Sequence, residues 1–360
     1  MNVSAIVLAA GEGSRMRSDR PKPLHLICGR SMVMHVIHSL SGLDLTATVV
    51  VVGHGADRVT KKVADDAPEW AGVRFTIQRE QRGTGDATMV GLADLPGDDL
   101  DDTSTVLVMP GDTPLLRPET VAGLVTEHEK SGNAATVLTS VVEDATGYGR
   151  VVRDRHRRVV RIVEHRDAGA EQLTIREVNT GIYAFRRDLL GPALRQVGTD
   201  NSQGERYLTD VVAVLASKGH KVGAVDAPAS ETAGVNDRLQ LAMAERELRA
   251  RINRGWLLAG VTMLDPRQAF IDATVRIGRD VTLFPGVMLQ GDTVVGDRCE
   301  IGPNSRLVDT VVGDDSTVTV TTATAATIGS GADVGPYAHL GPGSRVADGL
   351  TTGPFYTGSP

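Results

Sequence analysis

The sequence predicts two domains of different class: a doubly wound, Rossmann-like α/β domain followed by a short left-handed parallel β-helix of hexapeptide repeats. Three observations support this prediction. The 360 residues exceed what one hydrophobic core usually organises; short β-branched runs alternate with helical segments up to about residue 227; and an aliphatic residue recurs every six positions after Gly260. We therefore expect an α/β domain at residues 1–230, a linking helix at 231–260 and the β-helix at 261–360.

The first part of the chain alternates between two periodicities. Strands are expected at Val3–Leu8, Thr48–Val52, Val73–Ile77 and Thr105–Met109, and helices at Met32–Leu40, Asp57–Ala64, Asp86–Leu95 and Pro118–Ser131. Nearly continuous apolar strands separated by helices indicate a parallel sheet covered on both faces. Ligands of such a sheet bind at the carboxyl ends of its strands. A long helical stretch from about 237 to 258 then connects the two domains.

The second part has a six-residue period. The aliphatic positions are Ile271, Ile277, Leu283, Leu289, Val295, Ile301, Leu307, Val312, Val318, Ile328, Val334, Leu340 and Val346, with one five-residue step between Leu307 and Val312. Glycine follows many of them. A period of this kind is typical of a parallel β-helix, whose corners need small residues. Three hexapeptides per turn give about four coils.

The composition argues against nucleic acid and membranes as partners. The chain has 38 Lys+Arg against 45 Asp+Glu, a net charge of −7, and only 3% aromatic residues. It therefore lacks a broad positive field and a base-stacking platform. The apolar run Val3 to Ala10 is too short to span a bilayer, so we expect a cytoplasmic protein. Cys28 and Cys299 lie far apart and are expected to be inert thiols.

The most informative segment follows the first predicted strand. Gly11-Glu12-Gly13 is a glycine-rich loop, whose backbone N–H groups can approach phosphate oxygens because glycine has no Cβ. Arg15 and Lys22 supply the local positive charge that the acidic chain otherwise lacks. The spacing fits neither a Walker A loop nor a dinucleotide fingerprint, since Met16 and Arg17 stand where those motifs need other residues.

These residues carry a resemblance to a known family. The stretch Leu8 to His25, LAAGEGSRMRSDRPKPLH, resembles the signature of the sugar-1-phosphate nucleotidyltransferases, in detail that of the bacterial bifunctional N-acetylglucosamine-1-phosphate uridylyltransferases/glucosamine-1-phosphate acetyltransferases, the GlmU family. The likeness continues through motifs that begin at Gln78, Gly111, Gly147, Ile162, Glu177, Tyr207 and Gly234. It covers nearly the whole chain and implies transfer of a nucleotidyl group from a nucleoside triphosphate to a sugar-like 1-phosphate.

The resemblance assigns roles to individual residues. It implies Arg15 and Lys22 as catalytic cations, Leu8, Ala10, Gly11, Gly13, Gln78, Gly83 and Thr84 as nucleotide-binding, Gly149, Glu164, Asn179 and Thr209 as sugar-phosphate-binding, and Asp112 and Asn236 as ligands of Mg²⁺. Independently, Asp112 directly follows a buried strand, where a hard carboxylate oxygen suits Mg²⁺. For Asn236, a helix N-cap role is as strongly expected as ligation. A phosphate monoester is mostly dianionic at pH 7, so the reaction needs no general base.

Several departures from the family pattern bear on the substrate. Arg82, Asp86 and Pro110 replace the usual residues beside the nucleoside, and Arg82 and Asp86 are candidates for reading a different base edge. The first expectation is UTP with N-acetylglucosamine 1-phosphate. The alternative is a guanylyl- or other nucleotidyltransferase for a cyclitol or sugar 1-phosphate in antibiotic biosynthesis, resembling valienol-1-phosphate guanylyltransferase. A non-catalytic regulatory or assembly subunit is the alternative from another class.

The repeat domain carries two further expectations. Gly341 stands where the family has an arginine, and the acetyltransferase residues of the family lie mostly beyond the point that matches Pro360, so acetyl transfer is predicted to be absent. Left-handed β-helices of this family form trimers. With about four coils the interface falls near the ~1,000 Å² that a stable contact needs, so a concentration-dependent homotrimer is expected.

Overall fold

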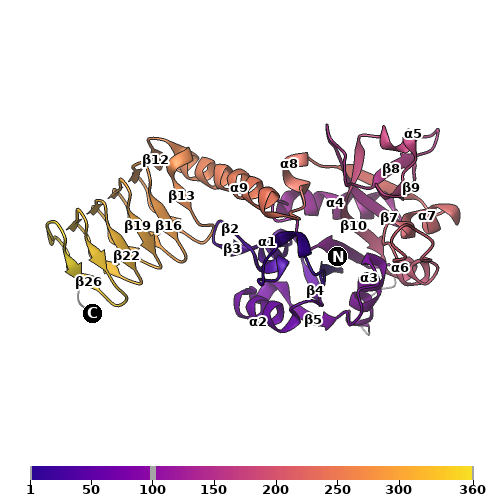
Figure 1. Cartoon of the computed structure of the whole chain (residues 1–360), viewed down its shortest axis with the longest axis horizontal. Coiled ribbons are helices and arrows are strands. Elements are labelled where there is room, and N and C mark those ends of the chain that lie inside the picture. Colours follow the sequence, from indigo (N-terminus) through magenta and orange to yellow (C-terminus); the bar gives the residue numbers. More distant parts are fainter. Residues whose placement is uncertain (1, 98–102, 359–360) are drawn as a thin grey trace. The chain divides into compact units, whose positions relative to one another are not determined.

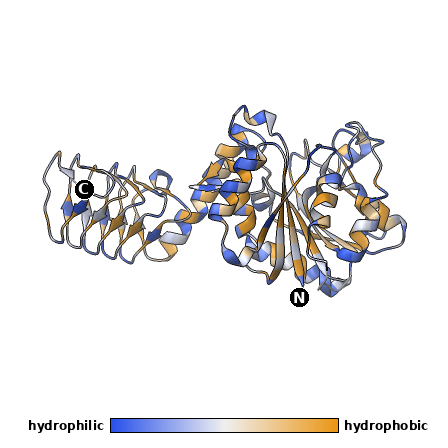
Figure 2. Cartoon of the chain, turned by 90° about the horizontal axis from the view of Figure 1, so that it is seen from below, coloured by the Kyte–Doolittle hydropathy of each residue, from blue (hydrophilic) through white to orange (hydrophobic). Residues whose placement is uncertain are grey.

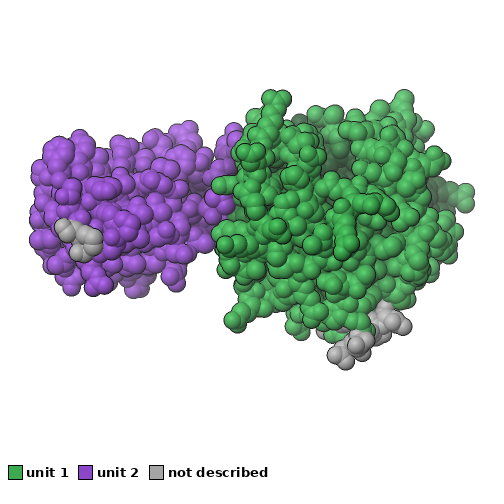
Figure 3. All heavy atoms as spheres, turned by 60° about the horizontal axis from the view of Figure 1, so that its bottom comes forward, with its two compact units in different colours: residues 1–25, 31–241 green, residues 26–30, 242–360 purple. Residues whose placement is uncertain are grey.

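The computed structural model describes residues 2–97 and 103–358, and these form two compact units. Unit 1 comprises residues 1–25 and 31–241, and unit 2 comprises residues 26–30 and 242–360. Figure 3 colours the two units separately. The first is the expected α/β domain and the second is the expected β-helix, so the predicted fold class is confirmed.

Unit 1 is built on a nine-stranded sheet. Seven strands follow the order β11 (Val222–Asp226), β7 (Ala135–Val141), β10 (Glu177–Arg186), β6 (Thr105–Pro110), β1 (Val3–Ala9), β4 (Leu45–Val52) and β5 (Val73–Ile77), and β8 (Arg150–Arg153) and β9 (Val159–Val163) extend it beside β10. The four predicted strands are present. The sheet is not purely parallel, because β10 runs antiparallel to both β6 and β7.

Helices cover both faces of this sheet (Figure 1). They are α1 (Met32–His38), α2 (Ala56–Asp66), α3 (Thr84–Ala93), α4 (Pro118–Ser131), α5 (Ala170–Leu173), α6 (Arg187–Leu194), α7 (Asp210–Ser217) and α8 (Ala229–Thr232), with 3₁₀ turns at Ser14–Met16, Lys22–Leu24 and Glu69–Ala71. Alternate residues of β1 enter two separate cores: Ile6 packs with α3 and α6–α7 side chains, whereas Ala5 and Val7 pack with α1, α2 and α4. The sheet strands are accordingly mostly apolar along their length (Figure 2).

Helix α9 (Arg238–Leu258) is the longest helix, and its residues are divided between the two units. Its sequence alternates apolar residues with arginine and glutamate, and only Ala244 and Asn253 are buried. Among the residues that the structure describes, neither this helix nor any other is sufficiently long and apolar to traverse a bilayer.

Unit 2 is a parallel β-helix with three faces. The faces consist of β12 (Thr262–Met263), β15 (Thr282–Leu283), β18 (Glu300–Ile301), β21 (Thr317–Val318) and β24 (Asp333–Val334); of β13 (Phe270–Ile271), β16 (Met288–Gln290), β19 (Arg306–Val308), β22 (Thr322–Thr324), β25 (His339–Leu340) and β27 (Thr357–Gly358); and of β14 (Arg276–Ile277), β17 (Val294–Val295), β20 (Val311–Val312), β23 (Thr327–Ile328) and β26 (Arg345–Val346). The described residues therefore make about five coils, one more than expected. The periodic aliphatic side chains fill the interior.

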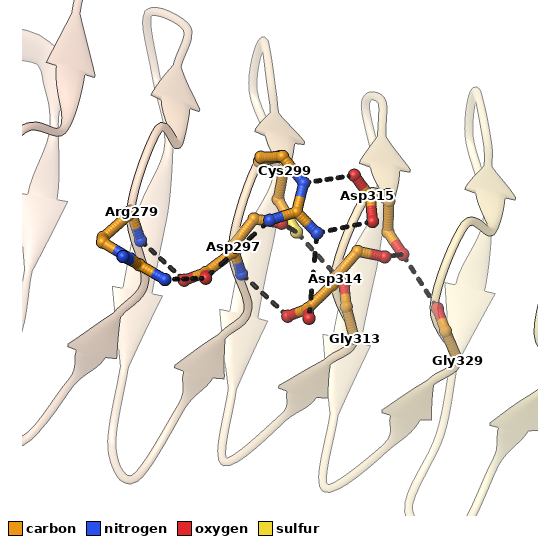
Figure 4. A network of polar contacts seen from close by, with 9 residues as sticks. Arg279, Asp297, Cys299, Gly313, Asp314, Asp315 and Gly329 are labelled. Carbon is orange, nitrogen blue, oxygen red and sulfur yellow. Dashed lines mark hydrogen bonds and ion pairs between the residues drawn. The ribbon is translucent and has the colours of Figure 1, made fainter.

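The glycine that follows many aliphatic positions has a specific cause. A Cβ on Gly278 would lie 2.4 Å from Oδ1 of Asp297, and a Cβ on Gly296 would lie 2.4 Å from Oδ1 of Asp314. These carboxylates accept backbone N–H groups from the preceding coil, as in the 2.9 Å bond from Asp297 N to Asp314 Oδ1 (Figure 4). Glycine thus leaves room for an aspartate ladder that satisfies the corner amides.

A two-stranded hairpin, β2 (Leu26–Ile27) with β3 (Arg30–Ser31), carries the segment 26–30 that belongs to unit 2. The Cys28 backbone N–H donates to Glu245 Oε2 at 2.7 Å, and Ala273 N–H donates to the Cys28 carbonyl at 2.9 Å. Burial raises the pKa of the Cys28 thiol well above its ordinary value, and the Glu245 carboxylate adds to that shift. Cys28 is therefore a structural residue with little thiolate at neutral pH.

Candidate functional site

A cavity of about 300 Å³ opens where β1, β5 and β6 end. It is lined by Leu8, Ala9, Ala10, Gly11, Lys22, Pro23, Gln78, Gln81, Gly83, Thr84, Ala87, Pro110, Gly111, Asp112 and Glu205. A larger hollow of about 580 Å³ lies at the amino ends of β1 and β6, beside Asn2 and Ser104. We assign the site to the smaller cavity, because it lies at the carboxyl ends of the strands and gathers the charged residues that the sequence predicted.

The glycine-rich loop fits closely around one lysine. Gly13 has φ +68°, and a Cβ there would lie 2.5 Å from the Cβ of Lys22. Only glycine tolerates both this conformation and this approach. Nothing lies within 4 Å of the corresponding position on Gly11, which lines the cavity. The loop therefore brings Lys22 against the cavity and leaves open space over Gly11, as a phosphate cradle requires.

Four predicted residues form one cluster, of which Lys22 and Asp112 line the cavity. The Lys22 ammonium forms an ion pair with Asp112 Oδ2 and donates to Asn236 Oδ1 at 2.9 Å. Arg15 donates to the same Asn236 oxygen at 3.0 Å. The Lys22 and Asp112 side chains are only 13% and 26% exposed, so their attraction is screened less than that of a surface pair. Residues from three distant parts of unit 1 thus form one charged cluster.

The start of α9 explains how Asn236 becomes available to this cluster. Asp237 Oδ1 accepts the Gln240 backbone N–H at 2.8 Å, which is the N-cap bond of the helix. Gln240 Oε1 in turn accepts the Asn236 backbone N–H at 2.7 Å. The N-cap role considered for Asn236 therefore belongs to its neighbour. The Asn236 side chain points its oxygen at the two cations instead.

The donor set suits Mg²⁺. Asp112 and Asn236 offer a carboxylate and an amide oxygen, both hard ligands, and both oxygens contact the same ammonium, so they converge on one point. No group of three or more His, Cys, Asp or Glu side chains that could hold a metal occurs in the described ranges 2–97 and 103–358. Mg²⁺ is typically bound by one or two protein oxygens, and water and phosphate oxygens complete its coordination.

The opposite wall of the cavity carries amide groups. Gln78 is 5% exposed, and its Nε2 donates to Asp86 Oδ2 at 2.8 Å and to the Gly83 carbonyl at 3.3 Å. Gln81 Nε2 donates to the Ala10 carbonyl at 2.8 Å. Arg82 forms an ion pair with Glu80, and both side chains are more than 60% exposed, so Arg82 is directed to the surface. Of the three replacements named in the sequence, Pro110 lines the cavity and the Asp86 side chain bonds to a residue that does.

The loop that carries Gly83 and Thr84 is held by a second segment. Gly83 has φ +103°, and a Cβ there would lie 2.5 Å from the Arg206 carbonyl oxygen. Thr84 Oγ1 accepts the Leu208 backbone N–H at 3.0 Å, and the Gly85 N–H donates to the Arg206 carbonyl at 2.8 Å. These bonds bring Glu205 to the cavity wall, which the sequence did not predict.

The four residues expected to bind the sugar form a second group. Asn179 N–H donates to the Gly149 carbonyl at 2.9 Å, and a Cβ on Gly149 would lie 3.4 Å from Glu164 Oε1. Burial raises the pKa of Glu164, and the nearby Asp167 and Asp210 carboxylates add to the shift. Thr209 is 4% exposed, and its hydroxyl interacts with the Glu164 carboxyl, which partly offsets the rise of that pKa. These groups are placed to bind hydroxyls.

Tyr148 connects the two groups of residues. Burial raises the pKa of its phenol, and the Asp112 carboxylate raises it further, which places the ring near the charged cluster. Its neighbour Arg150 is 2% exposed, and its Nε lacks a hydrogen-bond partner within the described ranges. The structure therefore brings most predicted residues together at the cavity and the adjoining group. Gly13, Arg15 and Asn236 lie outside the cavity lining, and Asn236 connects Arg15 to Lys22 through its side-chain oxygen.

Comparisons with known proteins agree with this arrangement. The model of a MobA-like NTP transferase domain matches residues 5–215, and the model of the bacterial transferase hexapeptide (six repeats) matches residues 274–308. The chain is 49% identical over 354 residues to the bifunctional protein GlmU of Streptomyces avermitilis, covering 98% of this chain and 72% of that one. It is 48% identical to its counterpart in Streptomyces coelicolor, with 95% and 70% covered.

More distant similarities extend the same result. The bifunctional protein GlmU of Caldanaerobacter subterraneus subsp. tengcongensis is 41% identical, with 91% of this chain and 69% of that one covered. Among solved structures, a UDP-glucose pyrophosphorylase complexed with UDP-glucose superposes with a TM-score of 0.56 at 14% identity. It covers 70% of this chain and 100% of that one. This last similarity is one of fold.

Proposed function

This chain belongs to the GlmU family of sugar-1-phosphate nucleotidyltransferases, and from that premise we propose that it uses Mg²⁺ and acts on an N-acetylhexosamine-type 1-phosphate through the residues described above. The observation that carries the proposal is the convergence of Lys22, Arg15, Asp112 and Asn236 beside the glycine-rich loop. The cluster combines phosphate-neutralising cations with the oxygen ligands of a divalent metal.

The reaction is a single displacement at phosphorus. A phosphate oxygen of the sugar 1-phosphate attacks the α-phosphorus of the nucleoside triphosphate and forms a new P–O bond. The bond between the α-phosphorus and the bridging oxygen to the β-phosphate breaks, and pyrophosphate leaves with that electron pair. No proton transfer is needed, because the attacking phosphate monoester is already dianionic near pH 7. Catalysis therefore rests on positioning and charge stabilisation.

The cations of the cluster supply that stabilisation. Lys22, fixed by Gly13 and by its two oxygen partners, is placed to neutralise charge that develops on the α-phosphate. Arg15, which is exposed at the loop, is placed to hold the leaving pyrophosphate. Mg²⁺, held by Asp112 and Asn236, would polarise phosphate oxygens when it is bound. The carboxylate that now pairs with Lys22 would then be shared with the metal.

The remaining residues orient the two substrates. Leu8, Ala10 and Gly11 form the floor of the cavity under the nucleotide, and Gln78, Gly83 and Thr84 form the wall for the base. The buried Thr209 hydroxyl, which interacts with the Glu164 carboxyl, and the Asn179 amide suit a ring rich in hydroxyl and acylamino groups. Buried polar groups favour a substrate that hydrogen-bonds to them.

The experiment is an assay of pyrophosphate release across a panel of substrates. UTP, GTP, ATP, CTP and TTP are each combined with N-acetylglucosamine 1-phosphate, glucose 1-phosphate and a cyclitol 1-phosphate, with and without Mg²⁺. We expect release that needs both substrates and is abolished by EDTA, with N-acetylglucosamine 1-phosphate the first acceptor to test. Equal rates with EDTA would remove the metal assignment. Preference for an acceptor without an acylamino group would remove the sugar assignment.

We also propose that unit 2 mediates assembly into a trimer. The repeat exposes apolar side chains that are 46–59% exposed, Val311 on the β20 face and Leu264 and Tyr337 at the bends between strands. Light scattering over a range of protein concentrations, on the full chain and on a chain ending at residue 260, tests this. Identical assemblies of the two chains would show that the β-helix does not join the subunits. The absence of acetyl transfer and the cytoplasmic location stay predictions.

A further inference from the structure

Three members of the charged cluster lie on short segments outside the sheet. Arg15 lies on the 3₁₀ turn Ser14–Met16, Lys22 begins the 3₁₀ turn Lys22–Leu24, and Asn236 lies just before α9. Short 3₁₀ turns have few internal hydrogen bonds, and these have poor geometry. The positions of the two cations therefore depend on contacts from elsewhere in the fold.

The side chain of Arg238 supplies one of these contacts. Arg238 is the first residue of α9 and lies two positions after Asn236. Its Nε donates to the Met16 carbonyl oxygen at 3.1 Å, at the end of the turn that carries Arg15. A guanidinium holds several N–H donors in a rigid planar fork. The same side chain therefore has donors left for a second acceptor.

The second acceptor is the buried ring of His25. Arg238 Nη1 donates to His25 Nδ1 at 3.4 Å. Because a guanidinium only donates, Nδ1 is the acceptor nitrogen of a neutral imidazole. Burial lowers the pKa of His25, and the charges of Arg238 and Arg20 lower it further, in agreement with that neutral form. The His25 backbone N–H donates to the Lys22 carbonyl at 3.2 Å, so this contact reaches the turn that carries Lys22.

The turn that carries Arg15 needs support from outside. It is flanked by Gly13 with φ +68° and by Arg17 with φ +48°. This left-handed region is open to glycine but strained for arginine. Strained positions persist only where the surrounding structure holds them. The bond from Arg238 holds the carbonyl of Met16, the residue directly before the strained position.

We propose that Arg238 is a positioning residue, whose guanidinium fork holds the Arg15 turn and the Lys22 turn against Asn236 and so assembles the charged cluster. The inference rests on the proposed function, since the cluster must be the catalytic one. Arg238 is not among the residues that line the cavity, so it acts through the segments that it joins.

Two substitutions separate the fork of Arg238 from its charge. This distinction matters because Arg238 also borders an open hollow beside Arg15 and Arg17, where a charge alone could attract phosphate. Arg238→Met keeps the aliphatic stem and removes every donor. Arg238→Lys keeps the charge, but one ammonium does not reproduce a planar fork with two acceptors. A misplacement of about 1 Å costs on the order of 10²-fold in rate. We therefore expect kcat for pyrophosphate release to fall on the order of ten-fold or more in both variants.

The loss should fall on kcat rather than on KM. The residues proposed for the sugar lie on other segments, around β8–β10 and before α7, so KM for the sugar 1-phosphate should change less than about three-fold. Arg246→Met is the matched control, because Arg246 is an exposed arginine of the same helix, and it should keep the wild-type kcat. The Tm of each variant is measured alongside, and kcat is compared well below the lowest Tm.

Each other outcome overturns a stated part of the account. Wild-type kcat in Arg238→Met removes the positioning role. Wild-type kcat in Arg238→Lys also removes it, because Arg238 would then act through its charge. A rise in KM for the sugar 1-phosphate as large as the fall in kcat would show general loosening of unit 1 and overturn the proposal as well. Failure of the proposed function looks different: the wild type itself then releases no pyrophosphate with any pair of substrates, and both proposals are wrong.

Discussion

The two units are held together by contacts of different sequence separation. In unit 2, each strand pairs with the strand one coil away, at a distance of 16–20 residues along the chain, and the same corner bond recurs from coil to coil. In unit 1, the charged cluster joins Lys22 to Asn236 across 214 positions. The repeated contacts of unit 2 give a regular framework. The charged cluster of unit 1 instead needs several different side chains from distant segments of the chain.

The largest effect should come from breaking the distant contacts of unit 1. Asp112→Ala removes the proposed metal ligand and the partner of Lys22, and should lower kcat by on the order of 10²-fold or more. The surface pair of Lys62 and Asp66 on α2 provides the control, because exposed pairs contribute little. Asp66→Ala should keep the wild-type rate. Rates of pyrophosphate release for both variants decide the matter, and a rate for Asp112→Ala within a few-fold of wild type would refute the assignment.

A second experiment acts on unit 2 alone. Leu289 is fully buried in the β-helix, and Leu289→Ala should cost about 2–5 kcal/mol of stability in that unit. Val311 lies in the same repeat and is 46% exposed, so Val311→Ala should lower the stability of the unit much less. Under native conditions both variants should keep kcat/KM within about two-fold. Loss of transfer in step with loss of stability would mean that the β-helix supports the site.

The buried His128 on α4 makes the stability of unit 1 depend on pH. Burial lowers the pKa of His128 to about 4, with a contribution from Arg186, against about 6.5 in the unfolded chain. The unfolded state therefore binds more protons between these values, so stability falls as the pH is lowered from 6.5 to 4. The loss is about 3 kcal/mol. Urea unfolding of His128→Gln at several pH values should show a correspondingly flatter profile; a slope equal to that of wild type would contradict it.

The smallest effect on the fold is expected at the proposed sugar-binding residues. Burial raises the pKa of Glu164, so its ionised form destabilises the folded state at neutral pH, and this cost disappears below the pKa of the unfolded chain. Glu164→Gln should therefore leave Tm at pH 7 unchanged or slightly higher, while raising KM for the sugar 1-phosphate. A lower Tm with unchanged KM would identify a structural residue instead. Gln172→Glu adds a negative charge on helix α5, which has no buried residue, and serves as the control for the charge removed in Glu164→Gln.

Sequence patterns predicted unit 2 more completely than unit 1 for a physical reason. A period of six predicted most interior positions from Ile271 to Val346, because each coil repeats the last, although it missed Ala323. In unit 1 the pattern predicted the strands β1, β4, β5 and β6, but not the antiparallel direction of β10, which depends on pairing with two distant neighbours. Periodicity does not encode strand direction.

The site shows the same limit at the level of single residues. The motifs predicted Lys22 and Asp112, and the structure adds that they contact each other. Patterns did not indicate Glu205, because its place in the cavity depends on the bonds that lock Arg206 against Gly85. Similarly, Asp237 rather than Asn236 caps α9, a choice between adjacent residues that only the backbone geometry reveals.

The role of Lys22 decides between direct transfer and a covalent intermediate. Its ammonium is held by Asp112 and Asn236, and a protonated amine has no lone pair with which to attack phosphorus. Burial raises the pKa of both cysteine thiols, and neither cysteine lines the cavity. We therefore expect direct transfer from triphosphate to sugar phosphate, without a covalent nucleotidyl-enzyme.

The stereochemistry at the α-phosphorus tests this directly. A single diastereomer of a nucleoside 5′-O-(1-thiotriphosphate) is turned over with the preferred sugar 1-phosphate, and the configuration of the product is determined by phosphorus NMR. One in-line displacement predicts inversion. Retention would require two displacements, with the nucleotidyl group held on a side chain such as Lys22 in between, and would contradict the account.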